Sequence, residues 1–277
     1  MTLWMYEIRM MLRPRMAIAA LVLLSLLALA SLVSGVQRMD SQRQAIARVG
    51  YLHAEDLAAV KAAHGDSTDA GRAAYYSFHP TWNPPSSLAF AAVGMRDVAP
   101  YILRVRALGL EAQIHDGDTF NPELALAGRF DFAFLLTFLL PLFVIALLHD
   151  IRSSETESGR ERMLRSLPLG VQWLYARRAV VRITALWLCT GLPFVIAAVQ
   201  QGVPATQMLA VLGLAATYLL FWAGLCLIVA WRGWNSGVNA ATLASLWVVI
   251  ALVAPAMAHV GIERAVQDEH PDDTALF

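Results

Sequence analysis

Residues 150–168 form a segment rich in charged side chains, and its chemistry is that of recognition. The segment mixes carboxylates with arginines: Asp150, Arg152, Glu155, Glu157, Arg160, Glu161, Arg162 and Arg165. Carboxylates and guanidinium groups form ion pairs and charge-assisted hydrogen bonds, within a chain or with a protein partner. We expect a short charged helix, with Ser154 as its N-cap and Glu161 paired with Arg165 one turn later. Gly159 weakens such a helix and Pro168 ends it.

The residue types that carry covalent or metal chemistry form no catalytic pattern. The sequence has no Cys-x-x-Cys, His-Glu-x-x-His or Gly-x-Ser-x-Gly motif. Four histidines are scattered without the spacing of metal ligands: His53, His64, His79 and His115. We therefore predict no catalytic residue, no metal site and no bound cofactor.

The lysine content excludes one class of ATPase. Lys61 is the only lysine, and it follows Ala58-Ala59-Val60, whereas a phosphate-binding P-loop places its lysine directly after a glycine. Any ATP would have to be bound by a partner subunit. The formal net charge is zero, so no basic face for nucleic acid is expected.

The composition points to a membrane protein. Hydrophobic residues make up 58% of the 277 residues, and the mean hydropathy is +0.54. A helix of roughly 20 apolar residues crosses a bilayer, and five runs meet this standard: 16–36, 130–148, 183–199, 207–230 and 238–260. Pro141, Pro193 and Pro255 lie inside spans, where each predicts a kink, with a functional hinge as the alternative.

A cleaved signal peptide is the alternative for the first run, because Ala28-Leu29-Ala30 fits a small-x-small cleavage site. The apolar run continues past this triplet, which favours a retained span. Before it, Trp4 and Ile8 recur at helical spacing, while Arg9 and Arg13 lie on another face. Residues 1–15 are therefore expected to form an amphipathic helix in the membrane interface, either as a plain anchor or as an elbow helix that moves with the bundle.

The distribution of arginine predicts the orientation, since short cytoplasmic loops retain positive charge. The loop 149–182 contains seven arginines, whereas the loop 200–206 contains no charge. We expect a cytoplasmic N-terminus and a periplasmic segment at 37–129, in a multi-pass protein of a bacterial inner membrane. Within 37–129, residues 42–63 favour a helix that could extend the first span, and the remainder suggests a small mixed domain packed on the membrane surface.

Several motifs, taken in order along the chain, resemble those of type-2 ATP-binding-cassette (ABC) exporter permeases. Residues 7–15, with Glu7, Ile8 and Arg13, are similar to that family's elbow helix. Asp150, Glu155-x-Glu157-x-Gly159 and Leu164-x-x-Leu167-Pro168 resemble its cytoplasmic coupling loop, although Arg160 stands where the family usually has threonine or a small residue. Leu88-Ala89-Phe90 and Gly128-Arg129-Phe130-Asp131 resemble the branch with a long periplasmic insertion after the first helix, often labelled multi-copper enzyme maturation permeases.

This resemblance implies a transporter subunit rather than an enzyme. A soluble ABC ATPase would bind the coupling loop, a second permease subunit would complete the transport path, and lipid would surround both. The family has a sixth span, so we expect residues 261–277 to be a periplasmic tail of a truncated chain, with a genuine five-span variant as the alternative. A membrane-anchored periplasmic sensor or scaffold without transport activity is the competing function. A membrane enzyme or intramembrane protease is disfavoured, because the predicted spans contain no interior ionisable residue.

Overall fold

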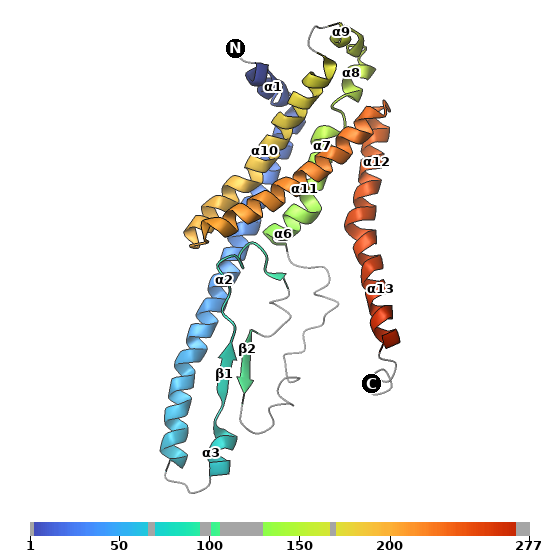
Figure 1. Ribbon diagram of the computed structural model, residues 1–277. Coiled ribbons are helices and arrows are strands. Elements are labelled where there is room, and N and C mark those ends of the chain that lie inside the picture. Colours follow the sequence, from blue (N-terminus) through green and yellow to red (C-terminus); the bar gives the residue numbers. More distant parts are fainter. Residues whose placement is uncertain (1–2, 66–69, 95–100, 106–129, 167–169, 270–277) are drawn as a thin grey trace. The chain divides into compact units, whose positions relative to one another are not determined.

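The computed structural model describes residues 3–65, 70–94, 101–105, 130–166 and 170–269 (Figure 1). Residues 106–129 of the expected 37–129 domain, including Gly128 and Arg129, lie outside these ranges, as do Leu167, Pro168 and residues 270–277.

Five helical stretches in the described part of the chain are long and apolar enough to cross a membrane. They are Arg15–His64, Phe132–Glu157, Val171–Gln200, Ala205–Trp231 and Ser236–Ile262. Each of the five predicted runs overlaps one of them. The prediction of a largely α-helical protein is confirmed, and the five predicted runs lie in helices that are long and apolar enough to span a membrane.

The first span belongs to a much longer helix than its apolar run. Helix α2, Arg15–His64, is continuous for 50 residues, which is about 75 Å at 1.5 Å per residue. The hydrocarbon of a bilayer is only about 30 Å thick, so the helix must continue well beyond it. Residues 42–63 therefore form a helical extension of the first span, as their composition predicted.

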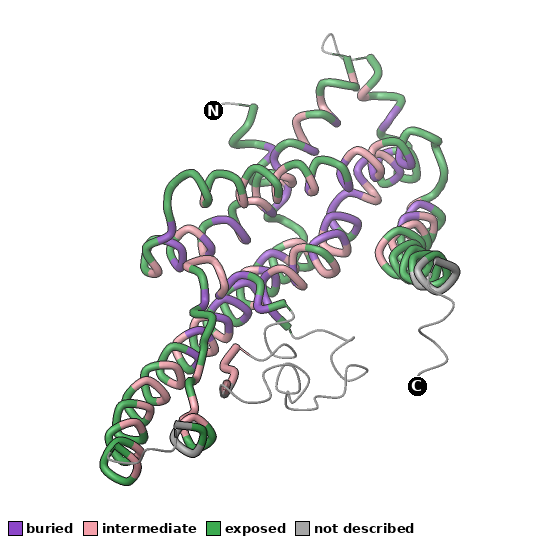
Figure 2. The backbone as a smooth tube through the Cα atoms, turned by 60° about the horizontal axis from the view of Figure 1, so that its bottom comes forward, coloured by how far each residue is buried: buried purple, intermediate pink, exposed green. Residues whose placement is uncertain are grey.

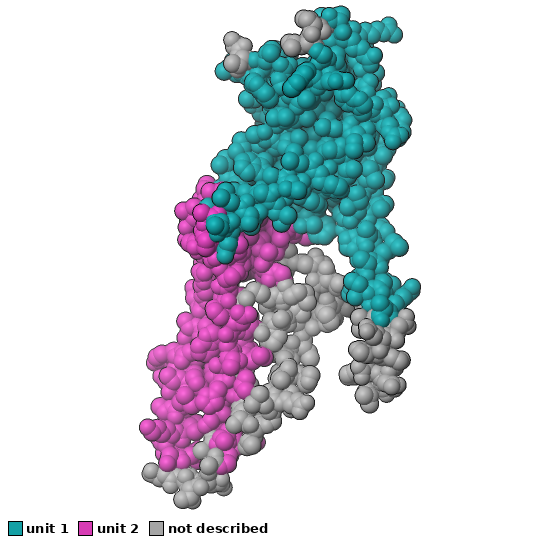
Figure 3. Space-filling model, viewed as in Figure 1, with its two compact units in different colours: residues 1–27, 135–192, 206–277 teal, residues 28–134, 193–205 magenta. Residues whose placement is uncertain are grey.

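The chain folds as two compact units (Figure 3). The first contains residues 1–27, 135–192 and 206–277. Its elements are α1 (Leu3–Met11), the start of α2, α7 (Leu140–Leu148), α8 (Ser153–Glu157), α9 (Glu161–Arg165), most of α10 (Val171–Gln200), α11 (Ala205–Trp231), α12 (Ser236–Val248) and α13 (Ala254–Glu269). Val144, Leu186, Trp222 and Leu243, from four different helices, are among its fully buried side chains.

Two turns of π-helix interrupt the spans of this unit. Turn η2, Leu135–Leu139, is followed by Pro141, and turn η3, Val249–Val253, is followed by Pro255. Each turn therefore ends two residues before a proline. Pro193 lies inside α10, which is assigned as one continuous helix. Two of the three predicted kink sites thus coincide with an irregular backbone.

The second unit contains residues 28–134 and 193–205. Strands β1 (His79–Trp82) and β2 (Ile102–Val105) form an antiparallel pair in which His79 lies opposite Val105 and Trp82 opposite Ile102. The unit also includes α3 (Ala70–Tyr76) and α6 (Phe132–Phe134). The expectation of a small mixed helix and strand region is confirmed, although the sequence did not locate the strands.

One close approach fixes the loop at residues 88–91 against α2. A Cβ added at Gly35 would lie 1.9 Å from the carbonyl oxygen of Phe90, which is closer than any real contact. The Phe90 ring is fully buried and stacks on Phe194, which also stacks on Phe132. Glycine at position 35 is therefore required by the packing of the second unit.

Candidate functional site

The charged segment after the second span forms two short helices instead of one. Helix α8 ends at Glu157, α9 begins at Glu161, and Gly159 between them has a φ of +73°. A left-handed residue cannot continue a right-handed helix, and glycine adopts this conformation without strain. The prediction of Ser154 as the N-cap is wrong, because Arg152 occupies that position and makes no side-chain capping bond.

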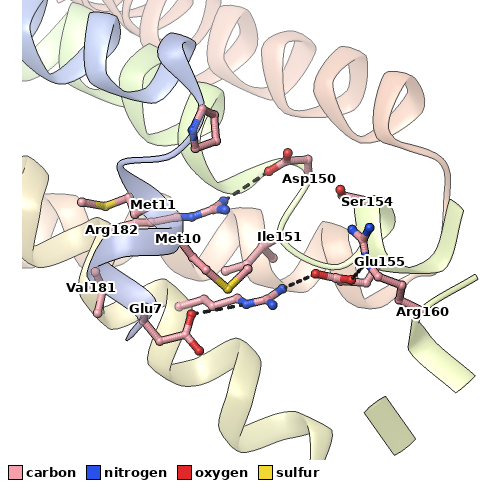
Figure 4. A pocket seen from close by; sticks show the side chains of 12 residues that line it. Glu7, Met10, Met11, Asp150, Ile151, Ser154, Glu155, Arg160, Val181 and Arg182 are labelled. Carbon is pink, nitrogen blue, oxygen red and sulfur yellow. Dashed lines mark hydrogen bonds and ion pairs between the residues drawn. The ribbon is translucent and has the colours of Figure 1, made fainter. Parts of the chain in front are cut away.

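Glu155 points into the protein. Its residue is 6% exposed, one carboxylate oxygen accepts from Nε of Arg160 at 2.6 Å, and the other accepts from Nη1 of Arg178 at 2.8 Å. Figure 4 shows Glu155 and Arg160 as a pair among the side chains that line a cavity. A buried carboxylate is costly unless it is paired and hydrogen-bonded, and here both oxygens are satisfied by guanidinium donors.

Arg178 also contacts a second buried carboxylate, that of Glu7 on the N-terminal helix α1. Glu7 is 3% exposed, and its carboxylate lies 3.5 Å from Nε of Arg178 and 3.7 Å from Nη2 of Arg177. Arg178 thus forms ion pairs with both Glu7 and Glu155. One guanidinium group on α10 therefore joins α1 to α8.

Most of α1 is exposed, including Trp4 and Ile8 of the predicted apolar face and Arg9 of the predicted polar face. Trp4 is 49% exposed and Ile8 is 44% exposed, and Arg13 is exposed in the turn after the helix. Only Glu7 and Met11 of this helix are buried. The helix thus presents aromatic and aliphatic side chains outward and attaches to the rest of the unit through a carboxylate.

A second set of ion pairs surrounds Glu161 at the start of α9. Its carboxylate accepts from Thr156 Oγ1, from Nη2 of Arg165 at 2.8 Å and from Nη2 of Arg152 at 3.1 Å. The hydrogen bond from Thr156, followed by those from the arginines, lowers the pKa of Glu161 to about 2. The predicted pairing of Glu161 with Arg165 is confirmed.

Arg152 carries this network to the end of α11. Its Nη1 donates to the carbonyl oxygen of Trp231 at 2.9 Å, and its guanidinium carbon lies 5.3 Å from the centre of the Trp231 ring. This geometry allows a cation–π interaction. Near the start of α8, Arg182 of α10 donates to Asp150 Oδ1 at 3.2 Å and to the carbonyl oxygen of Leu147.

Glu157 has a different role from Glu155. Its exposed carboxylate accepts from the backbone N–H of Ser236 at 2.7 Å, at the N-terminus of α12. A negative charge at a helix N-terminus is stabilised by the helix dipole. Asn235 caps the same helix through its side chain, and Asn239 donates to the carbonyl oxygen of His149 at 3.2 Å.

We define the loop cluster as Glu7, Glu155 and Glu161 together with the arginines that form ion pairs with them. They are Glu7, Arg152, Glu155, Arg160, Glu161, Arg165, Arg177 and Arg178. A cavity of about 170 Å³ lies among Glu7, Glu155, Arg178 and their neighbours, and an apolar groove of about 500 Å³ adjoins it along Leu164 and Trp173. Every carboxylate of the cluster is neutralised by arginine, so the arrangement favours mechanical connection over proton transfer.

The outward surface of the loop consists of other residues. Glu157, Gly159, Arg162 and Met163 are exposed, Met163 by 74%, and Leu164 is half-buried. The Arg160 side chain is 59% exposed although it is paired with Glu155. The remaining predicted coupling residues, Leu167 and Pro168, lie outside the described ranges. The residues of the loop that are accessible from outside are therefore Glu157, Gly159, Arg160, Arg162 and Met163.

The predicted motif before the second span has a structural explanation. Asp131 is 8% exposed, and its carboxylate accepts from the backbone N–H of Phe134 at 2.7 Å and from that of Val93 at 3.1 Å. The first bond caps helix α6, and the second holds the loop near residue 93 to the helix start. Phe130 packs edge-on against Phe134, with ring centres 5.9 Å apart.

Sequence reasoning missed the partners of the predicted carboxylates. In the sequence, Arg177 and Arg178 were used only as positive charges that predict which side of the membrane the loop faces. Their pairing with Glu7 was not predicted. A signal was present, because Glu7 is the only acidic residue among the first 39. A single carboxylate in an apolar helix requires a basic partner if the helix packs.

Within the described ranges, no group of three or more His, Cys, Asp or Glu side chains is placed to hold a metal ion. No family model, no curated protein and no solved structure matches the chain.

Proposed function

We propose that this chain is the permease subunit of an ABC-type exporter, which couples ATP hydrolysis by a separate soluble ATPase to movement of a substrate across a bacterial inner membrane. The observation that carries the proposal is Arg178, which forms ion pairs with Glu155 of the loop and Glu7 of α1. A coupling element must be attached firmly to the spans that it moves. The loop cluster supplies such an attachment through buried charge pairs.

The motif order from Glu7 to Leu164 supports the same assignment, as does the lack of a P-loop lysine. In the proposed orientation, the N-terminus and the loop cluster are cytoplasmic and the segment 37–129 is periplasmic. A second permease subunit, identical or related, completes the transport path. Glu155 positions the loop from within, whereas the exposed side with Gly159, Arg160, Arg162 and Met163 contacts the ATPase.

Charge reversal on the exposed side of the loop tests this proposal. Arg162→Glu changes an exposed residue with no ion pair among the described residues, so the fold should be preserved. We expect it to weaken retention of a co-purified ATPase by roughly tenfold or more, the scale of an interface hot spot. The readout is ATP hydrolysis by the tagged permease purified from its own host in detergent.

The matched control is Arg48→Glu, which reverses another exposed arginine, on the outer part of α2. It should leave the retained ATPase activity unchanged. If the parent protein retains no ATPase, or if both reversals reduce retention equally, the coupling assignment fails and the anchored sensor or scaffold becomes the better interpretation.

A further inference from the structure

The apolar groove beside the loop cluster is lined by both the N-terminal helix α1 and the start of α10. Its volume of about 500 Å³ lies within the range of pockets that hold small molecules. Both helices contribute apolar side chains to its lining, and α10 adds two arginines: Tyr6 and Met10 from α1, and Trp173, Leu174, Arg177 and Arg178 from α10. The groove therefore offers one ligand both apolar contacts and guanidinium groups.

Positive charge exceeds negative charge in the lining of this groove. Three arginines, Arg160, Arg177 and Arg178, accompany two carboxylates, those of Glu7 and Glu155. One positive charge is therefore left without a carboxylate. The surplus lies where side chains are largely buried, since those of Arg177 and Arg178 are only 18% and 11% exposed. A charge that is removed from water is costly unless it is paired, so this groove favours an anion.

Arg177 makes weaker contacts than its neighbour Arg178. Its ion pair with Glu7 spans 3.7 Å, which is too long for a hydrogen bond. Its Nε is buried and has no hydrogen-bond acceptor among the residues that the structure describes. Arg178, by contrast, donates to Glu155 at 2.8 Å. A guanidinium group carries five N–H donors and pairs well with phosphate, so Arg177 has donors for a further acceptor.

The position of these arginines along α10 matches the level of lipid phosphates. Arg178 precedes the apolar run 183–199 by five residues, which is about 7.5 Å along a helix. The headgroup layer extends roughly 5–8 Å beyond the hydrocarbon on each side. Tyrosine and tryptophan are enriched at the same interface, and Tyr6 and Trp173 are 59% and 72% exposed. In a bilayer, the groove would therefore lie where acyl chains end and phosphates begin.

We propose that the groove binds one anionic phospholipid of the surrounding membrane, with its phosphate at Arg177 and Arg178 and an acyl chain along Tyr6 and Trp173. Phosphate oxygens match the donor geometry of guanidinium groups. A free phosphate ion would make no use of the apolar walls, which is why a lipid is favoured. The bound lipid joins α1 to α10 beside the ion pairs of Glu7. This inference rests on the membrane location that the proposed function includes, and it is independent of ATPase coupling, which the retention assay tests separately.

Native mass spectrometry of the purified chain in detergent measures this binding directly. The probes are phosphatidylglycerol, which is anionic, and phosphatidylethanolamine, which is zwitterionic, with identical acyl chains. Phosphatidylglycerol should bind more tightly by roughly tenfold or more, and Arg177→Gln should remove most of this preference, because a hydrogen bond to a charged group contributes on that scale. The matched control is Arg232→Gln, which removes an exposed arginine between α11 and α12 that does not line the groove. It should leave the preference unchanged.

A second variant keeps the test valid if Arg177→Gln disturbs the packing of α1. Gly170 lines the groove, and a Cβ added there would have nothing within 4 Å, so Gly170→Phe should fill the groove and leave both arginines in place. It should weaken phosphatidylglycerol binding by roughly fourfold for each methylene that it displaces. Excess inorganic phosphate should not displace the bound lipid. The proposal would be overturned by equal binding of the two lipids, by equal losses in Arg177→Gln and Arg232→Gln, by unchanged binding in Gly170→Phe, or by displacement with inorganic phosphate alone.

Discussion

The second and fifth spans carry the same backbone irregularity in very different surroundings. In Phe132–Glu157, 44% of the most apolar stretch is buried against the rest of the chain, whereas in Ser236–Ile262 only 6% is buried. In Figure 2, helix α13 at the end of the fifth span is mostly green, which marks exposed residues. Both spans place a π-turn two residues before a proline. Of the two turns, only that of the second span accepts hydrogen bonds from side chains to its backbone carbonyls among the described residues. Tyr218 of α11 donates to the Thr137 carbonyl oxygen at 2.7 Å, and Trp247 of α12 donates to that of Phe138 at 3.1 Å.

This difference separates what local sequence determines from what packing determines. A proline in a helix disturbs the preceding turn wherever it occurs. Whether that turn is rigid depends on neighbours that can donate to its carbonyls. The turn in the second span accepts side-chain hydrogen bonds and lies in a more buried span. The fifth span exposes Val249, Leu252 and Met257, so its π-turn should be more flexible.

The largest expected contrast comes from truncating one leucine in each span. Leu140 is 1% exposed and Leu252 is 47% exposed. Leu140→Ala should lower the free energy of unfolding by about 2–4 kcal/mol, because it leaves a cavity among packed helices. Leu252→Ala should cost less than about 0.5 kcal/mol. Thermal unfolding in detergent measures both, and similar losses would show that the two spans are equally well packed.

A second contrast concerns the carboxylates that anchor the two spans. Glu161 accepts hydrogen bonds from three side chains in the loop after α7, whereas Glu157 accepts one from the backbone at the start of α12. Glu161→Gln should cost about 1–3 kcal/mol, the scale of hydrogen bonds to a charged group. Glu157→Gln should cost about 0.3–1 kcal/mol through the helix dipole. An equal loss from both variants would contradict the contrast.

The contribution of Glu161 should also depend on pH in a defined direction. Its folded pKa is about 2, below the value of 4.5 expected without the fold, so the unfolded chain takes up a proton first as pH falls. The stabilisation is fully present above about pH 5 and is lost between about pH 4.5 and 2. The stability difference between parent and Glu161→Gln should therefore be constant from about pH 8 to 5 and shrink below that. A difference that shrinks already near neutral pH would refute the assignment.

The smallest effect comes from the prolines themselves. Pro255→Ala provides an N–H where no side chain donates among the described residues, so it should stabilise the protein by about 0.5–1 kcal/mol. Pro141→Ala provides one where Tyr218 already donates, so its gain should be close to zero. Melting temperatures of the two variants decide the matter. A larger gain at Pro141 than at Pro255 would contradict this contrast.

The spans were predictable from the sequence because length and hydropathy alone determine them. The existence of helix α1 and the pair of Glu161 with Arg165 followed equally directly from helical spacing. Each depends on residues within a few turns of one another, where geometry is known in advance.

The sequence could not reveal which distant residues meet. Glu155 looks like an exposed loop carboxylate until Arg178, 23 residues later, is placed beside it. Likewise, Tyr218 and Trp247 are ordinary aromatic residues of apolar spans until their donors reach η2. Gly159 was expected to weaken one helix, but its positive φ ends the helix and starts another. Tertiary packing supplies this information, and no single segment contains it.

The close approach at Gly35 has a consequence for the variation that the protein can tolerate. Any side chain at position 35 would collide with the Phe90 backbone, which cannot move aside as a flexible side chain would. Gly213 and Gly224, by contrast, have nothing within 4 Å of an added Cβ. In a library of single variants selected for a folded protein, position 35 should therefore retain only glycine, while positions 213 and 224 accept alanine and serine freely.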